Sequence, residues 1–138
     1  LGSSSWHFPG WAGQVWARPV PEALLSRAGL AAYAQHPLFN AVSLDRAFYR
    51  ALDAAEATRL AAQARAAAPG FRFVVKAPAL LSDATRRDPA TGAPLAPNPG
   101  FLDPDAAVAS VRALVQGLGE ALGPWVLQLS PLPAAWRD

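Results

Sequence analysis

Two charged residues, Asp45 and Lys76, have the strongest potential for chemistry in this sequence. Each stands near the end of a short, mostly apolar run, residues 40–45 and 71–77, typical of a buried strand. A carboxylate and an ammonium group at strand ends can move protons or hold an ionic ligand, because burial and nearby charge tune both groups. We therefore take Asp45 and Lys76 as candidate catalytic residues. The alternatives are a structural ion pair between them, or an Asp45 that caps a loop.

Five further residues are candidates for ligand binding. The guanidinium of Arg50 could hold a carboxylate or phosphate in a two-pronged way, although its stem could equally pack over loop backbone. Tyr49 and Gln128 would orient the ligand. Trp6 and Trp11, in an aromatic segment, would form a wall of the pocket or, alternatively, a hydrophobic plug over one end of the fold.

No metal or cofactor is expected from the pattern of ligating residues. His7, Asp45 and Asp83 lie near three successive strand ends, but this spacing is generic and no ligand pair lies one helical turn apart. The chain has no cysteine, which excludes disulfides and thiolate metal sites. A Ser-His-Asp order, a glycine-rich phosphate loop and a zinc motif are also absent.

The elements that must position these residues alternate between strands and helices. Strands are predicted at residues 1–5, 40–45, 71–77 and 125–130. A first helix is predicted from Pro21 to Ala34, a second from a capping box at Asp53 to residue 69, and a third from Asp103 onward. This alternation predicts βαβ units and hence a parallel sheet. The two long connections, 6–20 and 80–102, follow strand ends on the side where barrels place their active sites.

The strands have one polar and one apolar face when they are read with a period of two. The apolar face is mostly Val, Leu and Phe. In a barrel the polar face would point inward, and its topmost layer would line the mouth of the active site. The polar set consists of Gly2, Ser4, Trp6, Ser43, Asp45, Arg72, Lys76, Gln128 and Ser130.

The composition is that of a single globular domain over residues 1–138. Hydrophobic residues make up 52% of the chain and charged residues 16%, unlike a disordered segment. The net charge is only +2 and the arginines are scattered, so no nucleic-acid-binding stripe is predicted. No stretch resembles a membrane span of about 20 apolar residues. Together with the lack of cysteine, these features lead us to expect a cytoplasmic protein.

Several short motifs occur in the order seen in one known family. They are Gly2-Ser3-Ser4-Ser5-Trp6, Phe48-Tyr49-Arg50, Phe71-Arg72-Phe73-Val74-Val75-Lys76 and Leu122-Gly123-Pro124 followed by Gln128-Leu129. In this respect the chain resembles the YecE-like family, also called domain of unknown function seventy-two, as a divergent member. The resemblance implies a TIM-type barrel of uncharacterised activity. Ser43 stands where that family has a glutamate, and Ser82-Asp83 where it has Thr-His.

These features predict an α/β protein that supplies the first four strands and three helices of a (β/α)8 TIM-type barrel. A whole barrel takes about 250 residues, so 138 residues make about the N-terminal half, to be completed by further chain or by a second copy. The predicted function is a pocket for a small polar or anionic molecule at the C-terminal strand ends, with or without an enzymatic reaction. The alternatives are a non-catalytic binding or interaction module and, by fold analogy alone, a metal-dependent phosphodiester hydrolase.

Overall fold

A four-stranded parallel sheet forms the centre of the computed structural model, which describes residues 1–132. The strands are β1 (Gly2–Ser3), β2 (Ala41–Leu44), β3 (Arg72–Lys76) and β6 (Leu122–Val126). They pair in the order β1-β2-β3-β6, so the neighbours in this sheet follow one another along the chain. The predicted α/β class with a parallel sheet is therefore confirmed.

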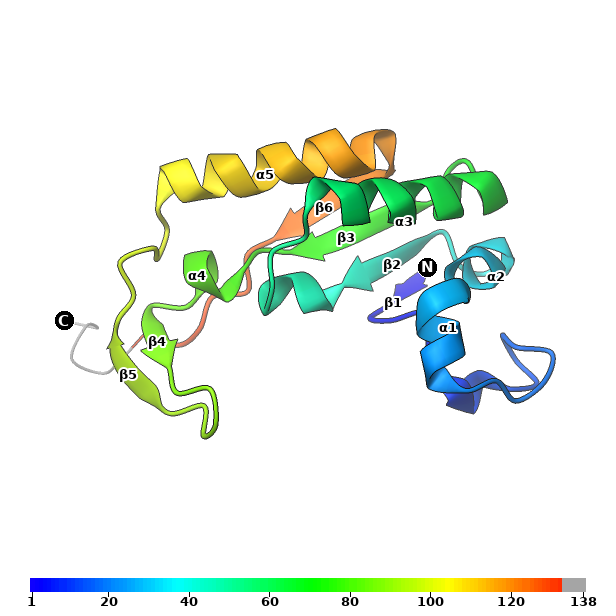
Figure 1. Cartoon of the computed structure of the whole chain (residues 1–138), viewed down its shortest axis with the longest axis horizontal. Coiled ribbons are helices and arrows are strands. Elements are labelled where there is room, and N and C mark those ends of the chain that lie inside the picture. The colour runs from blue at the N-terminus through cyan, green and yellow to red at the C-terminus, as the bar shows by residue number, and fades with distance from the viewer. Residues whose placement is uncertain (133–138) are drawn as a thin grey trace.

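Two long helices, α3 (Ala54–Ala67) and α5 (Pro104–Leu118), lie side by side over one face of this sheet (Figure 1). Both begin where the sequence predicts. Asp53 accepts a hydrogen bond from the Glu56 amide at 2.7 Å, and Asp103 accepts one from the Ala106 amide at 2.9 Å. These side chains satisfy backbone donors that the first turn of each helix would otherwise leave unpaired.

The single helix predicted from Pro21 to Ala34 is wrong in one respect, because the structure divides it into two. Helix α1 (Glu22–Ala28) and helix α2 (Leu30–Gln35) meet at Gly29, which is buried. A Cβ on Gly29 would lie 2.6 Å from the Leu25 carbonyl oxygen, so the backbone approaches more closely here than a side chain allows. Glycine also has a low helix propensity, and both effects favour a break at this point.

The hydrophobic core lies between the sheet and the helices. Val42 and Leu44 of β2 and Phe73 and Val75 of β3 are all almost fully buried. The alternate residues of both strands are only partly buried or exposed, as the burial pattern along each strand shows. The predicted division of β2 and β3 into an apolar and a polar face is therefore confirmed.

The long connection predicted at residues 80–102 contains regular structure that the sequence analysis missed. A short helix α4 (Ala79–Ser82) leads into strand β4 (Thr85–Arg87), which pairs antiparallel with β5 (Pro94–Pro97). This hairpin projects beyond the C-terminal ends of the central strands (Figure 1).

Three 3-10 turns complete the described elements: η1 (Pro9–Trp11), η2 (Asp45–Phe48) and η3 (Gly119–Ala121). The fourth central strand begins three residues earlier than predicted and ends at Val126. Among the described helices none has the length and apolar character needed to cross a membrane.

Candidate functional site

The structure brings the two candidate catalytic residues into direct contact at the C-terminal edge of the sheet. Lys76 is the last residue of β3, and Asp45 follows β2 directly, where Leu44 pairs with Val75. The Lys76 Nζ lies 3.1 Å from Asp45 Oδ2, and both side chains remain about one-third exposed. The Ser43 hydroxyl donates a hydrogen bond to the other carboxylate oxygen of Asp45. Parallel pairing of adjacent strands thus places Ser43, Asp45 and Lys76 in one polar cluster.

A small cavity of about 60 Å³ adjoins this cluster. Ser43 and Asp45 line one side of it, and Ser4, Trp6 and His7 line another. His7 Nδ1 lies 3.3 Å from a carboxylate oxygen of Glu22, which begins α1. Serine and histidine side chains can both donate and accept hydrogen bonds, so the cavity suits a polar group.

Trp6 forms a wall of this cavity, as the sequence predicts, but it is also part of the hydrophobic core. Its side chain is only 5% exposed, and its buried indole Nε1 has no hydrogen-bond acceptor among the residues that the structure describes. The Arg46 guanidinium lies 5.7 Å from the centre of the Trp6 ring. Arg46 also lines the cavity and was not singled out from the sequence; its place one residue after Asp45 was the available signal.

Arg50, a candidate from the sequence for holding an anion, does not line this cavity. Its guanidinium pairs with Glu56 at 2.8 Å, and Arg46 contacts the other oxygen of the same carboxylate at 2.7 Å. Glu56 lies in the first turn of α3 and is therefore close to the segment that contains both arginines. The guanidinium of Arg50 thus links the segment after β2 to α3 through Glu56 and does not line the cavity.

Three other predicted ligand-binding residues do not line the cavity beside Asp45. Tyr49 is 85% exposed and contacts Phe48 through its ring edge. Trp11 stacks on Tyr33 and on Phe39, which precedes the N-terminal end of β2, so it packs at the opposite end of the sheet. Gln128 is exposed and lies beyond the end of β6.

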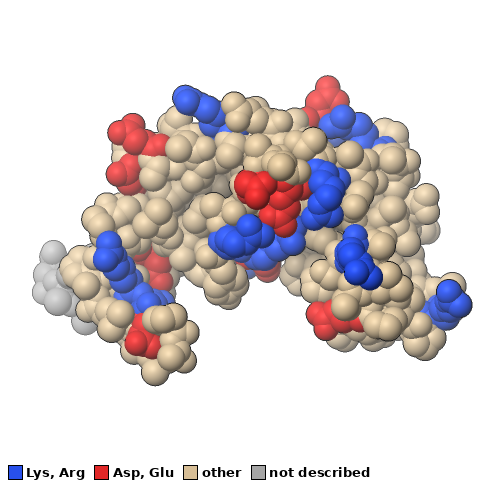
Figure 2. Space-filling view, in the orientation of Figure 1, with Lys and Arg blue, Asp and Glu red and all other residues tan. Residues whose placement is uncertain are grey.

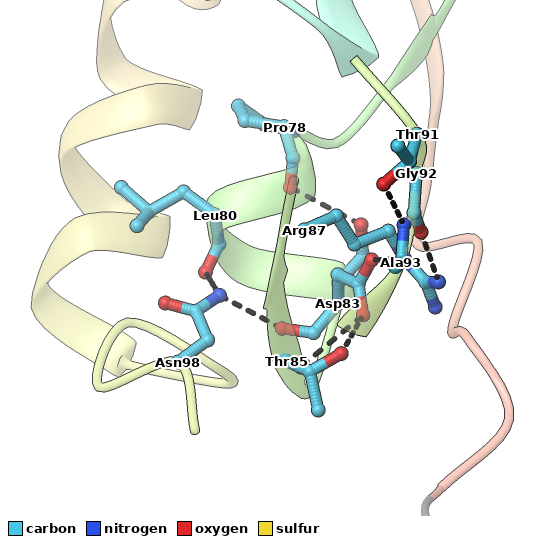
Figure 3. Close-up of polar contacts among 10 residues, drawn as sticks. Pro78, Leu80, Asp83, Thr85, Arg87, Thr91, Gly92, Ala93 and Asn98 are labelled. Atoms are coloured by element: carbon cyan, nitrogen blue, oxygen red, sulfur yellow. Dashed lines mark hydrogen bonds and ion pairs between the residues drawn. The ribbon is translucent and has the colours of Figure 1, made fainter. Parts of the chain in front are cut away.

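Asp83 has a structural role at the base of the hairpin (Figure 3). Its carboxylate contacts the Nε of Arg87 at 2.5 Å and accepts a hydrogen bond from the Thr85 amide at 3.2 Å. The Asn98 side chain donates to the Leu80 and Asp83 carbonyl oxygens, at 2.8 and 2.7 Å. Burial alone would raise the pKa of Asp83, but the hydrogen bonds and the charge of Arg87 outweigh it and hold that pKa below its usual value.

Charged side chains of both signs lie at the surface of the described residues. Figure 2 shows acidic and basic side chains beside one another on the face in view. Within residues 1–132, no group of three or more His, Cys, Asp or Glu side chains is placed to hold a metal ion.

A parallel sheet with helices over one face, and with polar side chains at its C-terminal edge, defines an α/β protein built from βα units. The chain belongs to the family described as Protein of unknown function DUF72, whose model matches residues 1–137. The family resemblance seen in the sequence motifs is therefore confirmed. Comparison with curated proteins and with solved structures gave no match.

Proposed function

We propose that this protein binds a small polar molecule with an anionic group at the C-terminal edge of its sheet. The observation that carries the proposal is the contact between Lys76 and Asp45 beside the cavity lined by Ser43 and His7. Ligands of βα proteins bind outside the carboxyl ends of the strands, which is where this cluster lies.

The charges of the cluster define the ligand further. The Lys76 ammonium has three N–H donors, and one of them contacts Asp45. The others can donate to an anionic group at the same time. Asp45 can accept a hydrogen bond from the ligand but repels its negative charge. The site therefore favours a molecule that combines an anionic group, held by Lys76, with a hydroxyl or amino donor, held by Asp45. Inorganic phosphate has both features in a single small ion.

A thermal-shift titration with phosphate tests this proposal. At ten times its Kd, a ligand of the folded state adds about 1.4 kcal/mol, which raises the Tm of a chain this size by about 4 °C. We expect this shift for the wild type, with sodium chloride at equal ionic strength as the reference, and its loss in Lys76→Met.

The matched control is Arg72→Met, because Arg72 lies on the same strand and on the same face as Lys76 but at its other end. This variant should keep the full phosphate shift. Asp45→Asn provides a second variant in case Lys76→Met is poorly folded. The proposal fails if phosphate does not shift the wild type, or if Lys76→Met and Arg72→Met respond alike.

A role without catalysis is the second candidate, and the resemblance of the sequence motifs to the family favours it. That resemblance implies a glutamate at the position of Ser43, whose hydroxyl here binds Asp45. It also implies a histidine at the position of Asp83, which here is engaged with Arg87 in the hairpin. Ligand-induced stabilisation without turnover of any small phosphate or carboxylate ester would support a binding module, whereas ligand-dependent turnover lost in Asp45→Asn would support an enzyme.

We further propose that the sheet is part of a (β/α)8 barrel that additional βα units complete. Strands β1 and β6 each have only one partner among the described strands. Helix α5 has α3 on one side, while its outer side forms an apolar groove with Val108, Val111 and Val115. Val108 and Val115 are more than half exposed there. A further strand beside β6 and a helix beside α5 would cover both features, supplied by additional chain or by a second copy.

A further inference from the structure

Arg46 brings a permanent positive charge to the small polar cavity beside Asp45. Among the described residues that line this cavity of about 60 Å³, it is the only arginine or lysine. Lys76 contacts Asp45 but is not part of the lining. An anionic group that enters the cavity therefore meets Arg46 directly.

Two contacts fix the position of the Arg46 guanidinium. Its central carbon lies 5.7 Å from the centre of the Trp6 ring, a cation–π distance, and Trp6 is itself a wall of the cavity. Its Nη2 lies 2.7 Å from Glu56, which belongs to the first turn of α3. The Arg46 side chain is nevertheless 42% exposed, and a guanidinium has five N–H donors. Donors therefore remain for a ligand.

The ion pairs around the cavity leave one positive charge in excess. Arg46 and Arg50 share the single carboxylate of Glu56, one arginine on each oxygen. Because Arg50 also contacts Glu56, Arg46 can bind an anion without leaving that carboxylate unpaired. Lys76 offsets the charge of Asp45 through their direct contact. The three basic and two acidic side chains together match a ligand with one negative charge.

The size of the cavity limits this anion to a few heavy atoms. A water-sized group needs about 10–15 Å³, so about 60 Å³ admits about four or five heavy atoms. That is enough for a carboxylate and one neighbouring carbon with a hydroxyl group. Glu22 contacts His7 but does not line the cavity, and solvent screens its charge because its side chain is 66% exposed.

Asp45 provides the partner for the hydroxyl group. One of its carboxylate oxygens accepts a hydrogen bond from Ser43, and the other contacts Lys76. Each oxygen has two lone pairs, so Asp45 can accept a further hydrogen bond. Asp45 and Arg46 line the same cavity. A small hydroxy acid can thus donate its hydroxyl to Asp45 while its carboxylate contacts Arg46.

We propose that the ligand of this site is a small hydroxy-carboxylate, and that Arg46 is the residue that holds its carboxylate. Two N–H groups of one guanidinium edge match the two oxygens of a carboxylate. Lys76 keeps Asp45 from repelling the anion, and Asp45 orients it through the hydroxyl. This assignment rests on the ligand site proposed above and names its ligand class and a further binding residue.

Calorimetric titration with glycolate at constant ionic strength tests the assignment. A ligand of this size can reach a Kd of about 1 mM. We expect Arg46→Met to bind glycolate at least about tenfold more weakly than the wild type. The matched control is Arg50→Met, which also loses an ion pair with Glu56 but lies outside the lining, and which should bind within about twofold of the wild type. Arg46→Lys keeps the charge without the planar fork and should remain at least about threefold weaker. It also serves as the second variant if Arg46→Met is poorly folded.

Two further probes separate the parts of the ligand. Acetate lacks the hydroxyl and should bind the wild type about tenfold more weakly than glycolate, and ethylene glycol, without a carboxylate, should show no saturable binding. Equal glycolate affinities of the wild type, Arg46→Met and Arg46→Lys would overturn the assignment, as would equal losses in Arg46→Met and Arg50→Met. If phosphate binds and needs Lys76 while glycolate does not bind, the assignment fails but the proposed function stands. Absence of binding by both anions refutes both.

Discussion

The residue that best shows how context changes function is Asp83. Its position after β3 made it a candidate metal ligand or the remnant of a catalytic group. In the structure it is 5% exposed and tied to Arg87 and Thr85 at the base of the hairpin. A carboxylate in such surroundings stabilises the fold as long as it is ionised, so its role can be tested by varying the pH.

The pKa of Asp83 in the folded protein lies below the ordinary value of 3.8. The stabilisation it provides is therefore complete above about pH 4–5 and is lost as the pH falls through the folded-state pKa. We expect Asp83→Asn to lower the free energy of unfolding by about 1–2 kcal/mol at pH 7, a value reduced for the partial exposure of Arg87. The deficit should shrink as the pH falls below about 4 and Asp83 becomes protonated. Urea unfolding of both proteins at several pH values measures it.

The control for this experiment is Glu120→Gln, because Glu120 is exposed and takes part in no ion pair among the described residues. Its difference from the wild type should stay within about 0.5 kcal/mol at every pH. A constant deficit for Asp83→Asn between pH 7 and pH 2 would contradict the assigned role of its charge.

At the scale of elements, a close approach of α5 to α3 is made possible by a glycine. A Cβ on Gly117 of α5 would lie 2.3 Å from the Ala57 Cβ and 2.9 Å from the Ala54 carbonyl oxygen of α3. Alanine would favour an isolated helix by about 1 kcal/mol over glycine. At position 117 the added Cβ would force the two helices apart. The packing energy lost in this way exceeds the gain in helix propensity.

We therefore predict that Gly117→Ala lowers the free energy of unfolding by about 1–3 kcal/mol. Gly70→Ala is the matched control, since a Cβ at Gly70 meets no atom within 4 Å. Thermal unfolding of both variants is the measurement. A Tm for Gly117→Ala at or above that of the wild type would show that α3 and α5 are less tightly packed than in the structure.

The sequence predicts elements well where a local signal is strong. The aspartate caps at Asp53 and Asp103 mark the starts of α3 and α5 correctly. The hairpin of β4 and β5 could not be predicted, because Pro94 and Pro97 disfavour a strand and the pairing depends on Asp83 and Asn98. The low helix propensity of Gly29 was a local signal for the break between α1 and α2, but the close approach of the backbone there is visible only in the structure.

The candidate site also has a part that the sequence predicts and a part that depends on tertiary contacts. The contact of Asp45 with Lys76 could be predicted, because residues at the ends of adjacent parallel strands must be neighbours. The ion pair of Arg50 with Glu56 could not be predicted, because several acidic residues were available as partners. Trp11 is likewise placed by stacking on Tyr33, a tertiary contact between segments about 20 residues apart.

At the scale of the whole molecule, the open edges of the sheet have a consequence for association. Unpaired edge strands and the apolar groove of α5 are surfaces that another chain can cover. We expect residues 1–138 alone to dimerise at low micromolar concentration through these surfaces. Unfolding experiments on this chain are therefore compared at one fixed protein concentration, because the Tm of a dimer depends on concentration. Sedimentation over a range of concentrations measures the association. A soluble monomer throughout that range would contradict the half-barrel proposal and favour a small open sheet.

The most direct test of the central claim, a ligand site at the C-terminal edge of the sheet, is chemical-shift mapping of the protein during a phosphate titration. The account predicts that the amides of residues 4–7, 43–46 and 76 shift together with one saturating curve. The amide of Arg72, at the other end of β3, should stay unchanged. Shifts confined to the hairpin arginines, or no saturating shift near Asp45 and Lys76, would contradict it.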